Sequence, residues 1–273
     1  VVGLVTINLK SKIVGRMLDR DEGAVIDQAW FAVRLQRALD LRARLYDKPY
    51  YRLVHAEADG LPGIVIDRFG DVAVVQPNAA WAELHLDTLV AALMQVTGVT
   101  TVVKNGTGRS RTLEGMKEET TVVAGAVDGP IPVPMNGATY MADVTGGQKT
   151  GLFYDQRPNH AFAASLAKGA KVLDVFTHVG GFALAALANG AVSAVAVDAS
   201  APLLELVHER AVAHDVGESA RRGDLHALGD PGGQLLVHIR ADLQQIDLPH
   251  DHGRLLAGQG GIFTNPGVDL QNG

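Results

Sequence analysis

The chain has 273 residues, 47% of them hydrophobic and 20% charged, which is enough to bury a core and to form two modest domains. It contains no cysteine, which excludes disulfides, thiolate metal sites and a cysteine nucleophile from this chain. The net charge of −6 by itself argues against a strong nucleic-acid-binding protein.

Charge is unevenly spread along the sequence. Residues 1–52 hold ten Lys or Arg against six Asp or Glu, and residues 101–117 hold four against one. A basic face of this kind suits RNA binding, but it is equally typical of a solvated helix surface. Both interpretations stay open.

Nothing in the sequence predicts a membrane or metal protein. The most apolar stretch, residues 180–197, is interrupted by Asn189-Gly190, which favours a helix followed by a strand over a membrane span. The first residues lack the pattern of a signal peptide. We therefore expect a cytoplasmic protein without a membrane partner and without a metal site.

The first half of the chain predicts a small α+β domain. Residues 12–18 suggest a strand, and Asp27 is expected to cap a helix with Trp30, Phe31 and Leu35 on its apolar side. Short β-branched runs separated by turn residues then predict a three-stranded meander at 51–56, 64–67 and 72–76. A helix at 81–96 and a strand at 99–104 follow, and the prolines between 130 and 134 suit a linker.

The second half predicts an α/β domain. Asn136-Gly137 supplies the positive φ angles of a tight hairpin turn. After it, helices and strands alternate at 155–168, 171–176, 181–189, 192–198 and 201–214. This order implies right-handed crossovers and a parallel, doubly wound, Rossmann-like sheet. Residues 229–273 show no sustained periodicity, so the last strands are expected to be absent or malformed.

The candidate ligand site follows the first strand of that sheet. Open parallel sheets bind ligands beyond the carboxyl ends of their strands, where the strand order reverses. Asp174 and the pair Gly180-Gly181 lie there, and Asp198 ends the next strand, the usual place for a carboxylate that binds ribose hydroxyls. The pattern indicates a nucleoside-containing ligand.

The loop also indicates which nucleoside. The dinucleotide signature G-x-G-x-x-G is absent, and Asp174 puts a carboxylate beside the strand end, which suits a cationic amino-acid ligand. S-adenosylmethionine (SAM) has that character. The alternative is that the two glycines only serve a tight turn from strand to helix.

Three segments carry a family resemblance: KTGLFYDQRPNH (149–160), VLDVFTHVGGFALAALANGA (172–191) and VDAS (197–200). They resemble the PUA-domain-containing class I methyltransferases that make 5-methylcytosine in large-subunit ribosomal RNA. The resemblance implies three parts: the tail of a PUA-like unit with a linker helix at 1–45, a central domain at 46–135 and a SAM-dependent methyltransferase domain at 136–273. It implies SAM as cofactor and ribosomal RNA as partner.

The resemblance also implies roles for individual residues. The methionine end of the cofactor would be lined by Asp174, Phe176, Gly180 and Gly181, the ribose held by Asp198, the adenine faced by Asp224, and the pocket closed by Gln156 and Arg157. For Arg157, a surface salt bridge is an equal alternative. His178 is expected to be a spectator, and no catalytic residue is assigned.

The chain departs from the family after Asp224. Members continue to an Asp-Pro-Pro motif and a cysteine-bearing segment, and residues 225–273 contain neither. Relative to the family, the chain is expected to be truncated at both ends or frame-shifted. Three hypotheses remain: a family member acting on cytosine carbon-5, a non-catalytic SAM- or RNA-binding remnant, and a methyltransferase acting on an exocyclic amine or a protein.

Overall fold

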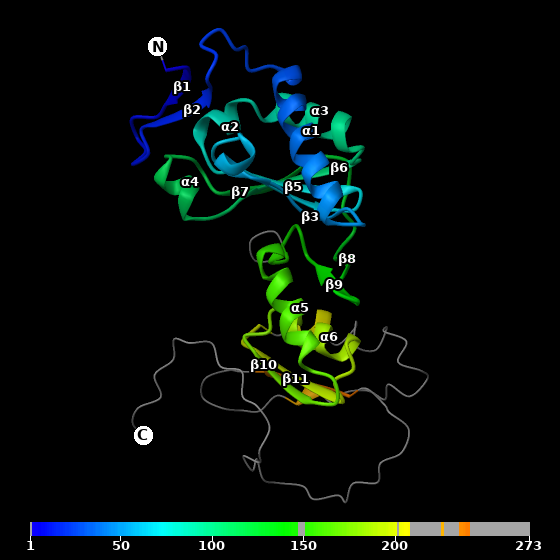
Figure 1. The fold of residues 1–273 in the computed structure, drawn as a ribbon. Coiled ribbons are helices and arrows are strands. Elements are labelled where there is room, and N and C mark those ends of the chain that lie inside the picture. Colours follow the sequence, from blue (N-terminus) through cyan, green and yellow to red (C-terminus); the bar gives the residue numbers. More distant parts are fainter. Residues whose placement is uncertain (1, 147–150, 201, 208–224, 227–234, 241–273) are drawn as a thin grey trace, which may run out of the picture. The chain divides into compact units, whose positions relative to one another are not determined.

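A computed structural model describes residues 2–146, 151–200, 202–207, 225–226 and 235–240 (Figure 1). The chain divides into two compact units. The first unit comprises Val1–Val133 and Met141–Asp155, and the second comprises Pro134–Tyr140 and Gln156–Gly273. The three-part division expected from the sequence stays a prediction.

The first unit is built on a five-stranded sheet in the order β3-β4-β5-β6-β7. Its strands are β3 (Tyr50–His55), β4 (Ile64–Phe69), β5 (Val72–Pro77), β6 (Thr101–Gly106) and β7 (Glu119–Ala124). Neighbours pair antiparallel except β5 with β6, which are parallel. The predicted meander is confirmed. The sequence did not indicate β7, because this edge strand is largely solvent-exposed and shows no alternation of buried and exposed residues.

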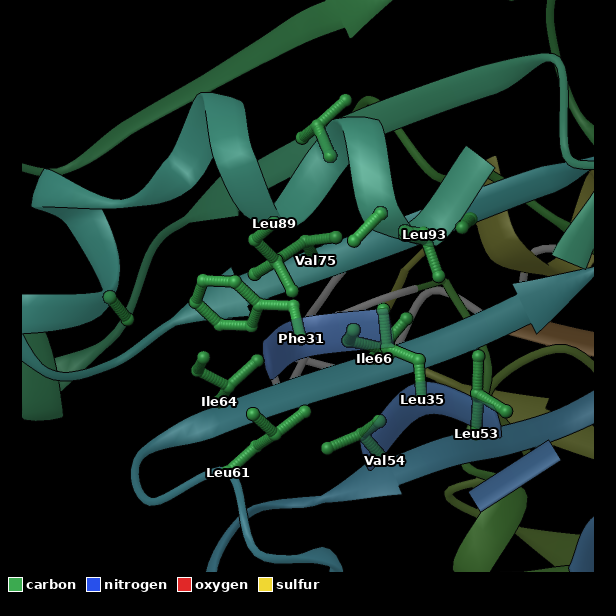
Figure 2. Packing of buried hydrophobic residues seen from close by; sticks show 14 of the residues in the cluster. Phe31, Leu35, Leu53, Val54, Leu61, Ile64, Ile66, Val75, Leu89 and Leu93 are labelled. Atoms are coloured by element: carbon green, nitrogen blue, oxygen red, sulfur yellow. The ribbon is translucent and has the colours of Figure 1, made fainter. Parts of the chain in front are cut away.

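Two helices cover one face of this sheet, α1 (Gln28–Leu45) and α3 (Leu86–Thr97). Figure 2 shows the core between them and the strands, where several side chains are almost completely buried: Phe31, Leu35, Ile64, Ile66, Leu89 and Leu93. The start of α1 is as predicted, because the Asp27 carboxylate accepts a hydrogen bond from the Trp30 amide at 2.8 Å.

Two local predictions in this unit have other bounds in the structure, and one helix was not predicted. The strand expected at 12–18 is β2 (Gly15–Asp19), paired with β1 (Leu4–Ile7), because residues 8–14 form the connecting turn, which the Asn8 amide closes on the Val14 carbonyl. The helix expected at 81–96 is split at His85 into α2 (Ala80–Leu84) and α3. A short helix, α4 (Arg109–Leu113), was not predicted.

The second unit begins with part of a hairpin formed by β8 (Ile131–Met135) and β9 (Ala138–Ala142), turning at Asn136 and Gly137 with positive φ as predicted. The α/β elements are α5 (Arg157–Ser165), β10 (Lys171–Val175), α6 (Gly181–Ala188) and β11 (Ser193–Asp198). Residues 202–207 are helical, and the rest of the helix expected at 201–214 lies outside the described residues. Helix α5 ends before residue 168 because the Leu166 and Ala167 amides bond three residues back.

The sheet of this unit has the order β10-β11-β13-β12, with β12 (Leu225–His226) and β13 (Leu235–Arg240). β10 and β11 are parallel, as predicted. β13 runs antiparallel to β11, so the sheet is mixed, whereas the sequence indicated only its parallel part. Residues 235–240 form a strand of this sheet that the sequence did not indicate, because a six-residue run is too short to show periodicity.

Two properties of the described residues bear on the expected function class. No helix among them has the length and apolar composition needed to cross a bilayer. The same residues contain no group of three His, Cys, Asp or Glu side chains placed to hold a metal ion.

Candidate functional site

The loop between β10 and α6 has an unusual backbone. Phe176 and His178 both adopt positive φ angles, 61° and 55°, and Gly180 follows at 81°. Positive φ is uncommon for residues other than glycine, and such strain persists where the surroundings impose it, often at ligand sites. The Thr177 amide donates to the Val197 carbonyl at 3.1 Å, which fixes the loop against β11.

Asp174, near the end of β10, holds this loop in place through hydrogen bonds. Its buried carboxylate accepts from the Thr177 hydroxyl at 2.5 Å and from the Ala183 amide at 3.0 Å. Ala183 is the third residue of α6, so the carboxylate satisfies an N–H group that the helix leaves free. Burial raises the pKa of Asp174, while the Thr177 and Ala183 hydrogen bonds lower it. Asp174 therefore joins strand, loop and helix.

Asp198, the last residue of β11, binds the same loop from the neighbouring strand. One carboxylate oxygen accepts from the His178 amide and the other from the Ser200 amide, both at 2.9 Å. The side chain is half-buried. An ionised carboxylate has about four acceptor positions, so it retains capacity for hydroxyl donors. The parallel pairing of β10 and β11 brings Asp174 and Asp198 to one edge, as the sequence predicted.

The glycine pair has a local explanation. Gly180 has the left-handed conformation that ends the loop. A Cβ atom at Gly181 would lie 2.5 Å from the His160 ring, and the Gly181 carbonyl accepts from the Tyr140 hydroxyl at 3.2 Å. The tight-turn alternative therefore accounts for both glycines without a ligand.

Gly181→Ala is expected to destabilise the chain by about 1–3 kcal/mol, because its methyl group would overlap the buried His160 ring. Denaturant unfolding measures the loss. His160→Ala in the same background should recover part of it, since the ring is then gone. Equal losses for Gly181→Ala and for Gly23→Ala, whose added Cβ would meet nothing closer than 3.5 Å and whose φ is likewise not positive, would refute the packing argument.

The other predicted residues lie as follows. The Phe176 side chain is 71% exposed at the loop. Gln156 precedes α5, and its side-chain oxygen accepts from Asn159 at 3.0 Å. The Arg157 side chain is half-buried, and its carbonyl accepts from the Asn136 side chain at 2.9 Å. Asp224 lies outside the described residues.

Sequence reasoning missed three residues that shape the site. Thr177 anchors Asp174, and its place three residues after a strand-end carboxylate was the available signal. His160 lies between two rings, Tyr140 at 6.5 Å and Phe182 at 4.5 Å between centroids. Burial raises the pKa of Tyr140, and the charge of Asp174 raises it further. The Tyr140 and His160 packing joins elements distant in sequence, so no local pattern indicates it.

Residues 85–253 match the family described as S-adenosylmethionine-dependent methyltransferase, over more than half of the chain. The chain belongs to this methyltransferase family. The matched range contains the loop, Asp174 and Asp198, so the strained edge of the second unit lies within the part of the chain that matches the family. SAM is the cofactor on which the family depends.

Relatives of this methyltransferase chain carry the name ribosomal RNA large subunit methyltransferase I. The protein from Alteromonas mediterranea is 39% identical over 199 residues, 72% of this chain and 50% of its own length. The protein from Yersinia pseudotuberculosis is 32% identical over 243 residues, 88% of this chain and 60% of its own length. The chain thus spans about half to three-fifths of the curated relatives it matches.

Solved structures with the same fold support the architecture. A Streptococcus mutans protein described as a SAM-dependent methyltransferase superposes with a TM-score of 0.65 at 22% identity, covering 77% of this chain and 55% of that chain. Another, solved in complex with SAH, gives 0.66 at 22% identity, covering 77% and 54%. The chain has the class I Rossmann-like methyltransferase fold, with a mixed sheet.

Proposed function

We propose that this chain is part of a SAM-dependent methyltransferase of large-subunit ribosomal RNA, and that it binds SAM at the carboxyl edge of β10 and β11. One observation carries the cofactor site: Asp198 holds the strained loop through the His178 amide and keeps free acceptor positions. The names of the relatives support the ribosomal RNA substrate.

The residues at this edge fit the cofactor chemically. The Asp198 carboxylate would accept the ribose hydroxyls, and the exposed Phe176 ring offers an apolar surface. Asp174 would act on the cofactor mainly by holding the loop in place, because its carboxylate is already bonded to Thr177 and Ala183. When bound, SAM supplies an activated methyl group. Gln156, Gly180, Gly181 and Asp224 remain further proposed members of the pocket.

Photolabelling tests this placement. Ultraviolet irradiation with [methyl-³H]SAM should label the tryptic peptide 172–210, which follows Lys171 and contains both carboxylates. Excess SAH should abolish the label, because it occupies the same site. Label confined to peptides of the first unit, or insensitive to SAH, would reject the site.

The proposed RNA surface lies on the first unit, where the two basic segments meet. The side chains of Asn8 and Ser11 donate to the Glu114 carboxylate at 2.9 and 2.5 Å, which joins the β1–β2 turn to the end of α4. Other cations of these segments form internal ion pairs, such as Arg42 with Asp59 and Lys104 with Glu83. Those pairs reduce the basic face that the sequence suggested.

Eight cations of the two segments are exposed and form no ion pair within the part of the chain that the structure describes: Lys10, Lys12, Arg20, Arg37, Arg44, Lys48, Arg109 and Lys117. Four of them lie in the β1–β2 turn, in α4 or just after α4: Lys10, Lys12, Arg109 and Lys117. The Lys10 side chain lies beside Gly115, directly after α4. We therefore define the basic surface of the first unit as these four residues and assign the RNA contact to it.

Binding of single-stranded RNA should weaken steeply with salt, with a slope in the double-logarithmic plot of roughly 0.7 per neutralised phosphate. Lys10→Ala combined with Lys12→Ala should reduce that slope by about 1.4, measured by fluorescence anisotropy. Arg37→Ala with Lys48→Ala removes the same charge elsewhere on the unit and should leave the slope unchanged. Affinity that does not respond to salt would favour the solvated-surface interpretation.

Finer proposals rest on the resemblance of the chain to the family of 5-methylcytosine methyltransferases. They are cytosine carbon-5 as the target of the whole protein, a PUA-like tail at 1–45, a central domain at 46–135, a methyltransferase domain at 136–273 and a cytoplasmic location. A non-catalytic remnant that binds SAM or RNA is the second candidate function, because the chain holds no cysteine.

A further inference from the structure

A cavity of about 280 Å³ opens in the first unit, and its lining residues all belong to that unit. Its lining comes from β3, from β5 and the residue after it, from the end of β6, from α4 and from the segment that precedes α5. The main polar and aromatic residues are Arg52, Gln76, Asn78, Thr107, Ser110 and Phe153. Pockets for drug-sized ligands occupy about 300–1,000 Å³, so this cavity suits a smaller group.

The charged groups around the cavity disfavour an anionic ligand. The Arg52 guanidinium donates two hydrogen bonds, at 2.9 and 3.1 Å, to the completely buried Asp67 carboxylate. Asp155, which lines the cavity itself, is a second carboxylate. A phosphate group would meet two negative charges around one guanidinium, so a neutral ligand is favoured.

The hydrogen-bonding groups of the cavity are mostly neutral amides and hydroxyls. The Ser110 hydroxyl donates to the Asn78 side-chain oxygen at 3.0 Å, which turns the amide nitrogen of Asn78 away from Ser110. Among the residues that the structure describes, the side-chain nitrogen of Asn78 and the side-chain amide of Gln76 form no hydrogen bond. Asparagine and glutamine amides bind base edges through paired donor and acceptor groups.

The wall of the cavity also carries an aromatic ring. Phe153 is half-buried, beside the buried Leu152. Unstacked bases of single-stranded RNA are held by aromatic stacking together with hydrogen bonds to their edges. A planar, neutral, hydrogen-bonding ligand of limited size matches the volume, the charge and the lining.

We propose that this cavity binds one unstacked nucleobase of single-stranded RNA, with Gln76 and Asn78 bonding to its edge and Phe153 against its face. The proposal rests on the RNA substrate proposed above. It adds a base subsite separate from the basic surface, which binds phosphates, and from the cofactor edge of the second unit.

The test compares two RNA probes with the same phosphates, a mixed-sequence nonamer and its fully abasic counterpart. Fluorescence anisotropy without SAM should show the base-bearing probe binding about tenfold more tightly. Gln76→Ala with Asn78→Ala should remove most of that gap and leave abasic binding unchanged. Gln36→Ala with Gln95→Ala, amides on exposed helix positions of the same unit, should keep the gap.

Equal affinity of the two probes for the unmodified chain, or an unchanged gap in the Gln76 and Asn78 variant, would overturn the base subsite. If that variant does not fold, as judged by thermal unfolding, Ser110→Ala at an exposed position should still narrow the gap, since it releases the Asn78 amide. Loss of all RNA binding at low salt would reject the proposed RNA substrate as well. SAH binding, measured separately, shows whether a loss of RNA binding reflects the RNA site itself or unfolding of the chain.

Discussion

The 273-residue chain by itself is expected to leave cytosine carbon-5 of ribosomal RNA unmethylated, even with saturating SAM. Carbon-5 becomes nucleophilic only after a thiolate adds to the neighbouring ring carbon, and the chain has no cysteine. Removing a catalytic nucleophile typically lowers kcat on the order of 10⁶-fold. Tritium from [methyl-³H]SAM should therefore not appear in 5-methylcytidine after digestion of the RNA to nucleosides.

A full-length relative named ribosomal RNA large subunit methyltransferase I, such as the Alteromonas mediterranea protein, serves in the same assay as the control for methyl transfer to ribosomal RNA. Labelled 5-methylcytidine formed by the purified chain, free of other methyltransferases, would contradict the cysteine argument. Label on an exocyclic amine would instead favour the third hypothesis, which needs no thiolate. Absence of any label, with SAH binding retained, would support the hypothesis that this chain by itself is a non-catalytic remnant.

Asp198→Ala is expected to weaken SAH binding by about 1–3 kcal/mol, roughly 5- to 150-fold in Kd. The proposed ribose contacts are lost, and the His178 amide loses its acceptor, so the loop is also less well fixed. Titration calorimetry measures the change. Asp198→Asn should lose less, because its side-chain oxygen still accepts one of the two amides.

Glu205→Ala is the matched control, since it removes one carboxylate from an exposed position of the neighbouring helical residues 202–207. It should leave SAH affinity unchanged within a factor of two, an order-of-magnitude limit set by surface electrostatics. Equal losses for the two alanine variants would mean that net charge, and not the ribose contact, governs binding.

The elements that the sequence predicted correctly are determined by residues that lie close together in the chain. Asp27 capped a helix, Asn136-Gly137 turned a hairpin, and alternating runs gave the meander and the pair β10 and β11. It did not predict the direction of β13, because strand polarity depends on where the chain returns to the sheet. It also missed β7, whose exposed positions lack alternation.

The candidate site shows the same division. Asp174 and Asp198 were identified correctly as neighbours at one sheet edge, since parallel strands bring their carboxyl ends together. The role of Asp174 as an anchor for Thr177 and Ala183 required coordinates, because the sequence does not specify which hydrogen bonds a buried carboxylate accepts. The His160 ring against Gly181 likewise depends on packing between separate helices.

The central claim is that the edge of β10 and β11 is a SAM site, and calorimetry of the unmodified chain with SAH and with NAD tests it most directly. The loop lacks the glycine spacing of dinucleotide sites and carries Asp198 at the ribose position. We predict saturable heat with SAH and none with NAD under the same conditions. Binding of NAD, with no response to SAH or SAM, would contradict the account.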